Sequence, residues 1–293
     1  MILGILLING IFGILKSDNF MKIYILGSSG MLGRYVVSYF EKQGKSVIPL
    51  KRSDFEINEQ FFQVDIVNLF TKVGISRDDV IINCIGAIKP QVDKISKSLS
   101  ILINSVFPNM LADYCAKRRV KLIHITTDCV FSGTKGSYKE NDSHDVTDLY
   151  GRSKSLGEPD NCCVIRTSII GEEVGQARSL VEWVKSNKGK SINGFTNHFW
   201  NGVTCLQAAK VFETIIDKNL YWEGIRHVYS NSINKYELLL LLNKTYQLDI
   251  SVEPKEAALC DRTLSSIHPS LFTVPNLDIQ IQEMKDFYPI LDA

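Results

Sequence analysis

The stretch H-I-T-T-D-C-V-F-S-G-T-K-G-S-Y-K-E-N-D-S-H-D-V-T-D-L-Y-G-R-S-K-S-L-G-E, residues 124–158, decides the fold. Its apolar start predicts a strand that ends in hydroxyl residues at Thr127, and after a Gly- and Asp-rich loop a helix begins at about Asp148. Tyr150 and Lys154 are four residues apart on that helix, so they share a face. A phenol, an ammonium and a hydroxyl then meet beyond the carboxyl end of a strand, where open α/β sheets place ligands.

Outward from this stretch, strand and helix patterns alternate along the chain. The predicted strands are Lys22 to Leu26, Ser46 to Leu50, Gln63 to Ile66, Asp79 to Ile85, Val120 to Ile125 and Val164 to Thr167. The predicted helices run from Met31 to about Gln43, Val67 to Val73, Ser98 to Arg118 with a kink or break at Pro108, and then about Cys205 to Asp217, Lys235 to Tyr246 and Ile279 to Phe287. This alternation predicts an α/β fold with a Rossmann-type, doubly wound parallel sheet and a smaller C-terminal substrate-binding lobe.

Bulk composition excludes several classes of protein. The 293 residues carry a formal net charge of +1, so no strong field favours nucleic acid or anionic lipid, and neither is an expected partner. The seven cysteines show no metal-type spacing and indicate reduced thiols in the cytoplasm. We expect no metal site.

A glycine-rich turn follows the first strand. Gly27, Gly30 and Gly33 form G-x-x-G-x-x-G between a strand and a helix, a variant of the dinucleotide fingerprint. The helix start offers unpaired N–H groups to phosphates. The expected cofactor contacts here are Gly27, Ser29, Gly30, Met31, Leu32 and Gly33.

The ends of the following strands complete the cofactor prediction. Lys51-Arg52 occupy the place where an NAD-selective site has an acid, and Arg52 would grip a 2′-phosphate. NADPH is therefore favoured over NADH, although Asp54 leaves NADH open. Asp65-Ile66 are expected beside the adenine, and Cys84, Ile85 and Gly86 beside the cofactor path.

Residues 1–20 form an apolar extension that is too short for a typical membrane span and lacks the flanks of a signal peptide. We favour an upstream start codon or a loosely packed tail, with a membrane anchor as the lesser alternative. Residues 21–170 are expected to form the NAD(P)-binding domain. Residues 171–293 are expected to be mainly the substrate-binding lobe, with some segments returning to the sheet.

The Tyr150–Lys154 pair predicts ketone reduction. A reduced nicotinamide gives hydride to a carbonyl carbon, and the oxygen then needs a proton from Tyr150. We expect Lys154 to lower the tyrosine pKa from its usual value near ~10, and Thr127 to hold the same oxygen.

Five motifs carry a resemblance: G-S-S-G-M-L-G, I-N-C-I-G, T-T-D-C-V-F-S-G, D-L-Y-G-R-S-K-S-L-G-E and V-I-R-T-S-I-I-G. They resemble the extended short-chain dehydrogenase/reductase family, and more narrowly its dTDP-4-dehydrorhamnose reductase group. The resemblance implies that Thr127, Tyr150 and Lys154 are catalytic. It also implies NADPH reduction of a nucleotide-linked 4-keto-6-deoxyhexose, which in this group makes an L-rhamnose-type nucleotide sugar for polysaccharide biosynthesis. Some relatives require magnesium, but no ligand set for it is recognisable here.

Two departures from the group pattern keep other substrates open. Asn83-Cys84-Ile85-Gly86 replaces the usual Asn-Ala-Ala run, and residues 194–204 resemble a sub-branch that acts on less certain sugars. A UDP-linked 2-acetamido-2,6-dideoxy-4-hexulose is thus a second substrate hypothesis. An epimerase with tightly held NAD and a non-catalytic regulatory subunit like that of methionine adenosyltransferase are further alternatives, and a homodimer is left open.

The substrate side is less distinct in the sequence. The candidates for lining a sugar-nucleotide pocket are Phe131, Arg166, Phe199, Trp200 and Asn201. Core packing is an equal alternative for the aromatic pair Phe199-Trp200. Arg262 is a further candidate phosphate ligand, with an ion pair to Asp261 as the alternative.

Overall fold

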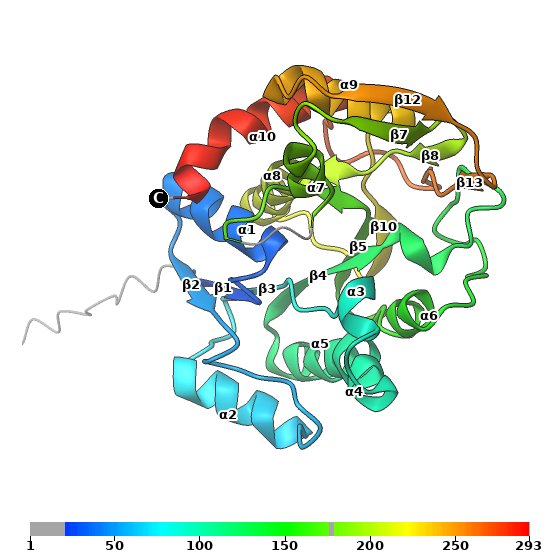
Figure 1. The fold of residues 1–293 in the computed structure, drawn as a ribbon. Coiled ribbons are helices and arrows are strands. Elements are labelled where there is room, and N and C mark those ends of the chain that lie inside the picture. Colours follow the sequence, from blue (N-terminus) through cyan, green and yellow to red (C-terminus); the bar gives the residue numbers. More distant parts are fainter. Residues whose placement is uncertain (1–20, 176–178, 293) are drawn as a thin grey trace, which may run out of the picture.

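The computed structural model describes residues 21–175 and 179–292, so the expectations for residues 1–20 lie outside the described part. A six-stranded sheet lies at its centre in the order β10-β5-β4-β3-β1-β2, and every pairing in it is parallel (Figure 1). The strands are β1 (Ile23–Leu26), β2 (Val47–Leu50), β3 (Val80–Asn83), β4 (Lys121–Thr127), β5 (Cys163–Thr167) and β10 (Gly224–His227). The predicted Rossmann-type parallel sheet is confirmed.

Successive residues of each strand face opposite layers, which gives two hydrophobic cores. Ile23 and Ile25 of β1 join the core under α1, α8 and α10, whereas Tyr24 and Leu26 join the core under α2 and α5. Figure 1 shows these two groups of helices on opposite sides of the sheet. The helices are α1 (Met31–Lys42), α2 (Gln63–Val73), α3 (Lys89–Val92), α4 (Lys97–Ile101), α5 (Phe107–Arg118), α6 (Leu149–Ser155), α7 (Leu180–Ser186), α8 (Cys205–Asp217), α9 (Lys235–Tyr246) and α10 (Leu277–Leu291).

Small sheets beyond β5 lie over the carboxyl side of the main sheet. They pair β6 (Ile169–Ile170) with β9 (Val203–Thr204), β7 (Ser191–Phe195) with β12 (Ser251–Lys255), and β8 (His198–Trp200) with both β11 (Ile233–Asn234) and β13 (Cys260–Asp261). In contrast, β10 pairs with β5 in the main sheet, and α8 and α10 pack on its α1 face. The chain after residue 171 thus contributes both to a lobe and to the sheet.

The strand predicted at Gln63 to Ile66 is wrong, because these residues open helix α2. The Asp65 carboxylate accepts the backbone N–H of Phe62 at 2.7 Å, which caps the start of the helix. Ile66, Leu69 and Phe70 are buried at helical spacing against the sheet. Consequently no described strand lies beyond β2, which forms the edge of the sheet.

The helix predicted from Ser98 to Arg118 is divided in three. A π-helical turn, Leu102–Val106, separates α4 from α5. Pro108 lies in the first turn of α5, where its missing N–H costs little, and the irregularity falls just before it. π-turns of this kind are frequent at functional sites.

Two histidines are buried at the sheet, each less than a tenth exposed. His124 on β4 has its Nδ1 at 3.0 Å from Asn83 Nδ2, and burial lowers its pKa to about 3. His227 at the end of β10 receives a hydrogen bond from Arg166, and burial followed by the Arg166 charge lowers its pKa to about 4. Both imidazoles are therefore neutral in the folded protein at neutral pH.

These histidines predict a loss of stability in acid. The unfolded imidazoles bind protons below about pH 6.5, whereas the folded ones resist protonation until the pH nears their lowered pKa values. The free energy of unfolding should thus fall by about 1.4 kcal/mol per pH unit per histidine below pH 6.5, as measured by urea denaturation. His124→Gln should flatten this slope and His198→Gln, at the half-buried start of β8, should not, so equal slopes in the two variants contradict the prediction.

Candidate active site

The glycine turn after β1 is held by very close backbone contacts. Gly27 has a φ of +75°, and a Cβ on Gly33 would lie 2.2 Å from the Gly27 carbonyl oxygen. Glycine is therefore required where helix α1 meets the turn. The N-cap Gly30 has no side chain to cap the helix, so the N–H groups at the start of α1 are offered outward. This geometry fits a dinucleotide pyrophosphate.

The basic pair after β2 lies at the exposed sheet edge. The Asp54 carboxylate accepts the backbone N–H of Lys51 at 2.9 Å, so it closes this turn. Arg52 is exposed, and no described residue pairs with its guanidinium. A free arginine beside an occupied aspartate suits a ribose 2′-phosphate better than a 2′-hydroxyl.

Asp65 and Ile66, which were expected at the end of a strand beside the adenine, lie instead in the first turn of helix α2. Asp65 caps α2, and the side chain of Ile66 is fully buried in the core beneath that helix. Their contact with an adenine stays a prediction.

The segment after β3 packs directly on the glycine turn. A Cβ on Gly27 would be 3.1 Å from backbone atoms of Cys84 and Ile85, and Asn83 Oδ1 accepts the Ile85 N–H at 3.1 Å. Cys84, Ile85 and Gly86 therefore lie in the segment that packs on the glycine turn, and their contact with a dinucleotide stays a prediction.

The three predicted catalytic side chains come from β4 and α6. The Asp148 side chain accepts the Gly151 N–H at 3.0 Å and caps α6. This cap fixes where the helix begins, and therefore where Tyr150 and Lys154 lie on it. Thr127, at the end of β4, donates from its hydroxyl to Asp128 Oδ1 at 3.1 Å and lies close enough to Tyr150 to lower the pKa of the phenol. The Lys154 ammonium lies against the loop after β3, where a Cβ on Gly86 would be 2.5 Å from Nζ.

The electrostatics of this group correct one expectation. Burial raises the pKa of Tyr150, and Lys154 is not among the groups that lower it; a hydrogen bond with Thr127 opposes the rise. Lys154 is 7% exposed, and burial lowers its own pKa to about 8 while Glu158 opposes this change. In the protein alone, Tyr150 is thus held protonated, which suits a proton donor.

Asn104 is a site residue that the sequence reasoning missed. It lies on the π-helical turn, where its Oδ1 accepts the Ala87 N–H at 2.8 Å and its Nδ2 donates to the Ala87 carbonyl and to Ser153 Oγ. It therefore ties the loop after β3 to the catalytic helix. The available signal in the sequence was a polar residue, Asn104, four positions before Pro108 within a long helical pattern.

The predicted substrate residues are mostly buried. Phe131 and Arg166 are both 0% exposed, and the Arg166 guanidinium lies 5.1 Å from the Phe131 ring centre. Trp200 belongs to the core, and the Asn201 amide bonds the backbone of Leu264 in both directions. These four side chains are thus engaged within the protein, and their contact with a ligand stays a prediction. Phe199 is half-buried and stays a candidate.

Two cations from the C-terminal lobe approach the site instead. Lys235 begins α9 and lies 5.2 Å from the Trp200 ring, and Arg262 Nε donates to the Phe131 carbonyl at 2.9 Å. Both interact electrostatically with the buried Asp128, whose pKa is nevertheless raised by burial. Neither has an ion pair within 4.0 Å in the described chain, and Asp261 bonds Thr263 rather than Arg262. Arg262 also interacts with Asp145 and Asp148, so the two cations lie among carboxylates but outside ion-pair distance of them.

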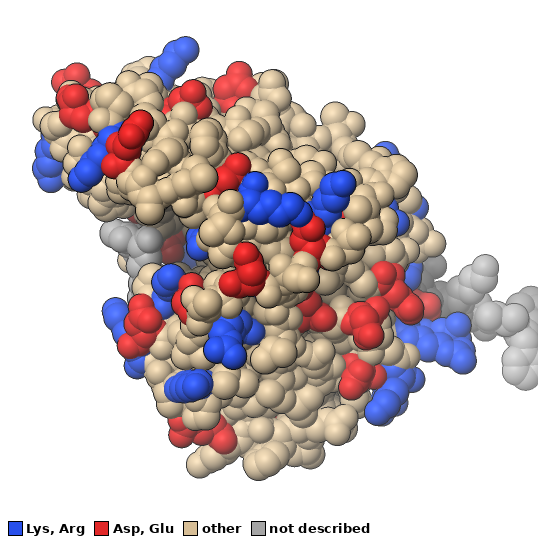
Figure 2. All heavy atoms as spheres, turned by 90° about the vertical axis from the view of Figure 1, so that its right-hand side faces the viewer, with Lys and Arg blue, Asp and Glu red and all other residues tan. Residues whose placement is uncertain are grey.

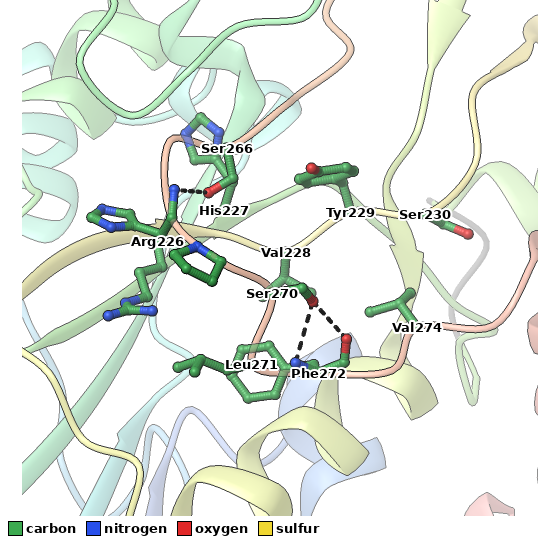
Figure 3. Close-up of a pocket in the computed structure, with 12 residues that line it drawn as sticks. Arg226, His227, Val228, Tyr229, Ser230, Ser266, Ser270, Leu271, Phe272 and Val274 are labelled. Carbon is green, nitrogen blue, oxygen red and sulfur yellow. Dashed lines mark hydrogen bonds between the residues drawn. The ribbon is translucent and has the colours of Figure 1, made fainter.

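The surface around the site is electrically mixed. Figure 2 shows acidic and basic side chains interspersed on the face that lies to the right in Figure 1. A cavity of about 330 Å³ lies nearby between the end of β10 and the segment 266–274. Figure 3 shows Tyr229, Leu271 and Phe272 around it. None of Thr127, Tyr150 and Lys154 lines it, so this cavity is separate from the catalytic group.

Two features are absent from the described residues. No group of three or more His, Cys, Asp or Glu side chains there is arranged to hold a metal ion. No helix among them has the length and apolar character needed to cross a membrane.

Comparison with known proteins places this geometry in a family. The RmlD substrate binding domain family matches residues 21–228. A probable low-salt glycan biosynthesis reductase, Agl14, of Haloferax volcanii is 28% identical over 229 residues, which cover 72% of this chain and 75% of that protein. A dTDP-4-dehydrorhamnose reductase of Mycolicibacterium smegmatis is 35% identical over 141 residues, 47% of this chain and 40% of that protein. The chain thus spans less than half the length of this second relative.

A solved structure agrees with the fold. The dTDP-4-dehydrorhamnose reductase of Bacillus anthracis in complex with NADP superposes with a TM-score of 0.75 at 18% identity, and covers 91% of this chain and 99% of that one. Methionine adenosyltransferase 2 subunit beta of Xenopus tropicalis is also similar, at 23% identity over 78% of this chain and 73% of that protein. On the family match over most of its length, this chain belongs to the RmlD substrate binding domain family.

Proposed function

We propose that this protein is an NADPH-dependent reductase of the 4-keto group of a nucleotide-linked 4-keto-6-deoxyhexose, with an L-rhamnose-type nucleotide sugar as product. The observation that carries the proposal is the meeting of Thr127, Tyr150 and Lys154 at the end of β4, beside the loop that packs on the glycine turn. Family membership and the reductases among its relatives support an oxidoreductase acting on sugar nucleotides.

The chain's own residues divide the work of reduction. A bound reduced nicotinamide supplies the hydride. The Tyr150 hydroxyl, held protonated by burial, donates the proton to the carbonyl oxygen, and Thr127 orients that hydroxyl. Lys154, with a pKa near 8, is mostly cationic at neutral pH, and its ammonium has no hydrogen bond in the described chain. It is thus available to the ribose hydroxyls of the cofactor and to the charge that develops at Tyr150.

The cations Lys235 and Arg262 support a substrate with a diphosphate. They come from the lobe that faces the end of β4, and neither has an ion pair within 4.0 Å in the described chain, so both charges are available to an anion. The base and the sugar stay part of the proposal, because a UDP-linked 2-acetamido-2,6-dideoxy-4-hexulose carries the same diphosphate.

Mass spectrometry of products from dTDP- and UDP-linked 4-keto sugars, with and without a 2-acetamido group, decides between these two substrates. No NADPH oxidation with any of these substrates would refute the reductase.

The similarity to methionine adenosyltransferase 2 subunit beta supports a second candidate, a non-catalytic regulatory subunit. Co-purification with a larger enzyme, together with no turnover of any sugar nucleotide, would favour it.

Tyr150→Phe tests the proton donor. It removes one hydroxyl and leaves the ring, so NADPH binding should be nearly intact while turnover falls by ~10²–10⁴-fold. Steady-state kinetics and NADPH fluorescence titration measure the two quantities. Tyr229→Phe, which changes a tyrosine at the separate cavity, is the control. Unchanged turnover in Tyr150→Phe would remove this residue from the role.

Arg52→Ala tests the cofactor preference. Because Arg52 has no partner in the described chain, its loss should weaken NADPH binding by about tenfold or more and leave NADH binding nearly unchanged. Calorimetric titration of both cofactors measures this, with exposed Arg77→Ala before β3 as a charge-matched control. Equal losses for NADPH and NADH contradict a 2′-phosphate contact.

Lys235→Gln tests the diphosphate contact. Removing one of two cations should raise the KM for the sugar nucleotide by about tenfold, with a small change in kcat, because a charged hydrogen bond to the substrate is lost. Lys244→Gln, exposed at the other end of α9, is the control. A KM that changes equally little in both variants would show that Lys235 does not meet the substrate.

A further inference from the structure

Arg166 was predicted as a substrate ligand. In the structure it is buried, and its hydrogen bonds link the region of the catalytic helix to the C-terminal lobe. It lies on β5 with no exposed surface. The guanidinium donates from Nε to Glu158 Oε1 at 3.0 Å and from NH2 to Glu158 Oε2 at 2.6 Å. This is a two-pronged pair with a carboxylate that is only 2% exposed.

Two imidazoles complete the coordination of this guanidinium. Arg166 donates from NH2 to His144 Nε2 and from NH1 to His227 Nε2, each at 2.8 Å. Because both Nε2 atoms accept, each imidazole carries its proton on Nδ1. Those protons also have partners: Ser155 Oγ lies 2.6 Å from His144 Nδ1, and the Ser265 carbonyl lies 2.6 Å from His227 Nδ1.

These bonds reach the end of the catalytic helix and the segment just after it. Ser155 is the last residue of α6, and Glu158 lies three residues beyond it. The third branch, through His227, reaches the segment that follows Arg262. Glu140 strengthens that branch, since its carboxylate accepts from His227 N, Ser266 Oγ and Ile267 N. One buried guanidinium therefore bonds, through three partners, the end of α6 and the lobe segment 263–267.

We propose that Glu158, Arg166 and His144 are positioning residues that hold Tyr150 and Lys154 in their reactive geometry relative to the C-terminal lobe. The proposal rests on the proposed reductase function. Helix α6 has only seven residues, so it depends on its neighbours for its place. Small displacements of a catalytic group cost large factors in rate, whereas cofactor binding depends less on α6, because the cofactor's phosphates are expected at the distant glycine turn.

Glu158→Gln tests this role, because it keeps the shape of the side chain and removes its charge. We expect hydrogen exchange of the α6 amides to rise at least tenfold, and kcat to fall by about 10²-fold, while the NADPH dissociation constant stays within threefold. The matched control is Glu172→Gln, whose carboxylate is likewise 2% exposed and paired with Lys185. It should lower the melting temperature to a similar extent, with α6 exchange and kcat within threefold of the wild type.

A milder variant keeps the test decisive if Glu158→Gln does not fold. Ser155→Ala removes only the half-buried link to His144, and it should raise α6 exchange and lower kcat by severalfold. Unchanged α6 exchange in a folded variant, or an equal loss of kcat in Glu172→Gln, would overturn the proposal. If the wild type reduces no sugar nucleotide, the proposed function fails, and hydrogen exchange of α6 still tests the positioning role separately.

Discussion

The parallel register of the central strands is the constraint on which the site depends. Leu26, Asn83 and His124 are neighbours across β1, β3 and β4, and Thr127 pairs with Thr167 on β5. The carboxyl ends of these strands therefore open on the same edge, and whatever follows each strand meets there. The glycine turn, the loop after β3 and the Thr127 hydroxyl come from distant parts of the sequence. No further device is needed to bring them together.

Sequence periodicity predicted the sheet and its cofactor side well, because buried parallel strands and glycine turns leave strong local signals. It failed at Gln63 to Ile66, which was predicted as a strand. There the Asp65 carboxylate accepts the Phe62 N–H and caps the start of a helix. The Tyr150 pKa was also misjudged, since the spacing of Tyr150 and Lys154 gives their common face but not the burial around the phenol. Arg166 shows the same limit: the sequence shows an arginine within an apolar strand, but not that it pairs with a carboxylate eight residues earlier.

Charge is distributed unequally between the two sides of the site. On the α6 side, Arg166 and Glu158 neutralise one another out of contact with water, so their attraction fixes geometry and leaves little field outside. On the lobe side, Lys235 and Arg262 interact with Asp128 but have no ion pair within 4.0 Å in the described chain. The first arrangement suits a rigid support and the second suits an anionic ligand. A net charge of only +1 for the whole chain conceals this difference.

The edge position of β2 also bears on how the molecule meets copies of itself. An edge strand offers unpaired backbone donors and acceptors on which another chain can extend the sheet. β2 is only four residues long, and its third residue is Pro49, which has no N–H to donate. The helix that replaces the expected further strand leaves this edge open, and the proline interrupts its hydrogen-bonding pattern. The sequence V-I-P-L thus ends the sheet at β2 and discourages the edge-to-edge stacking that leads to aggregates.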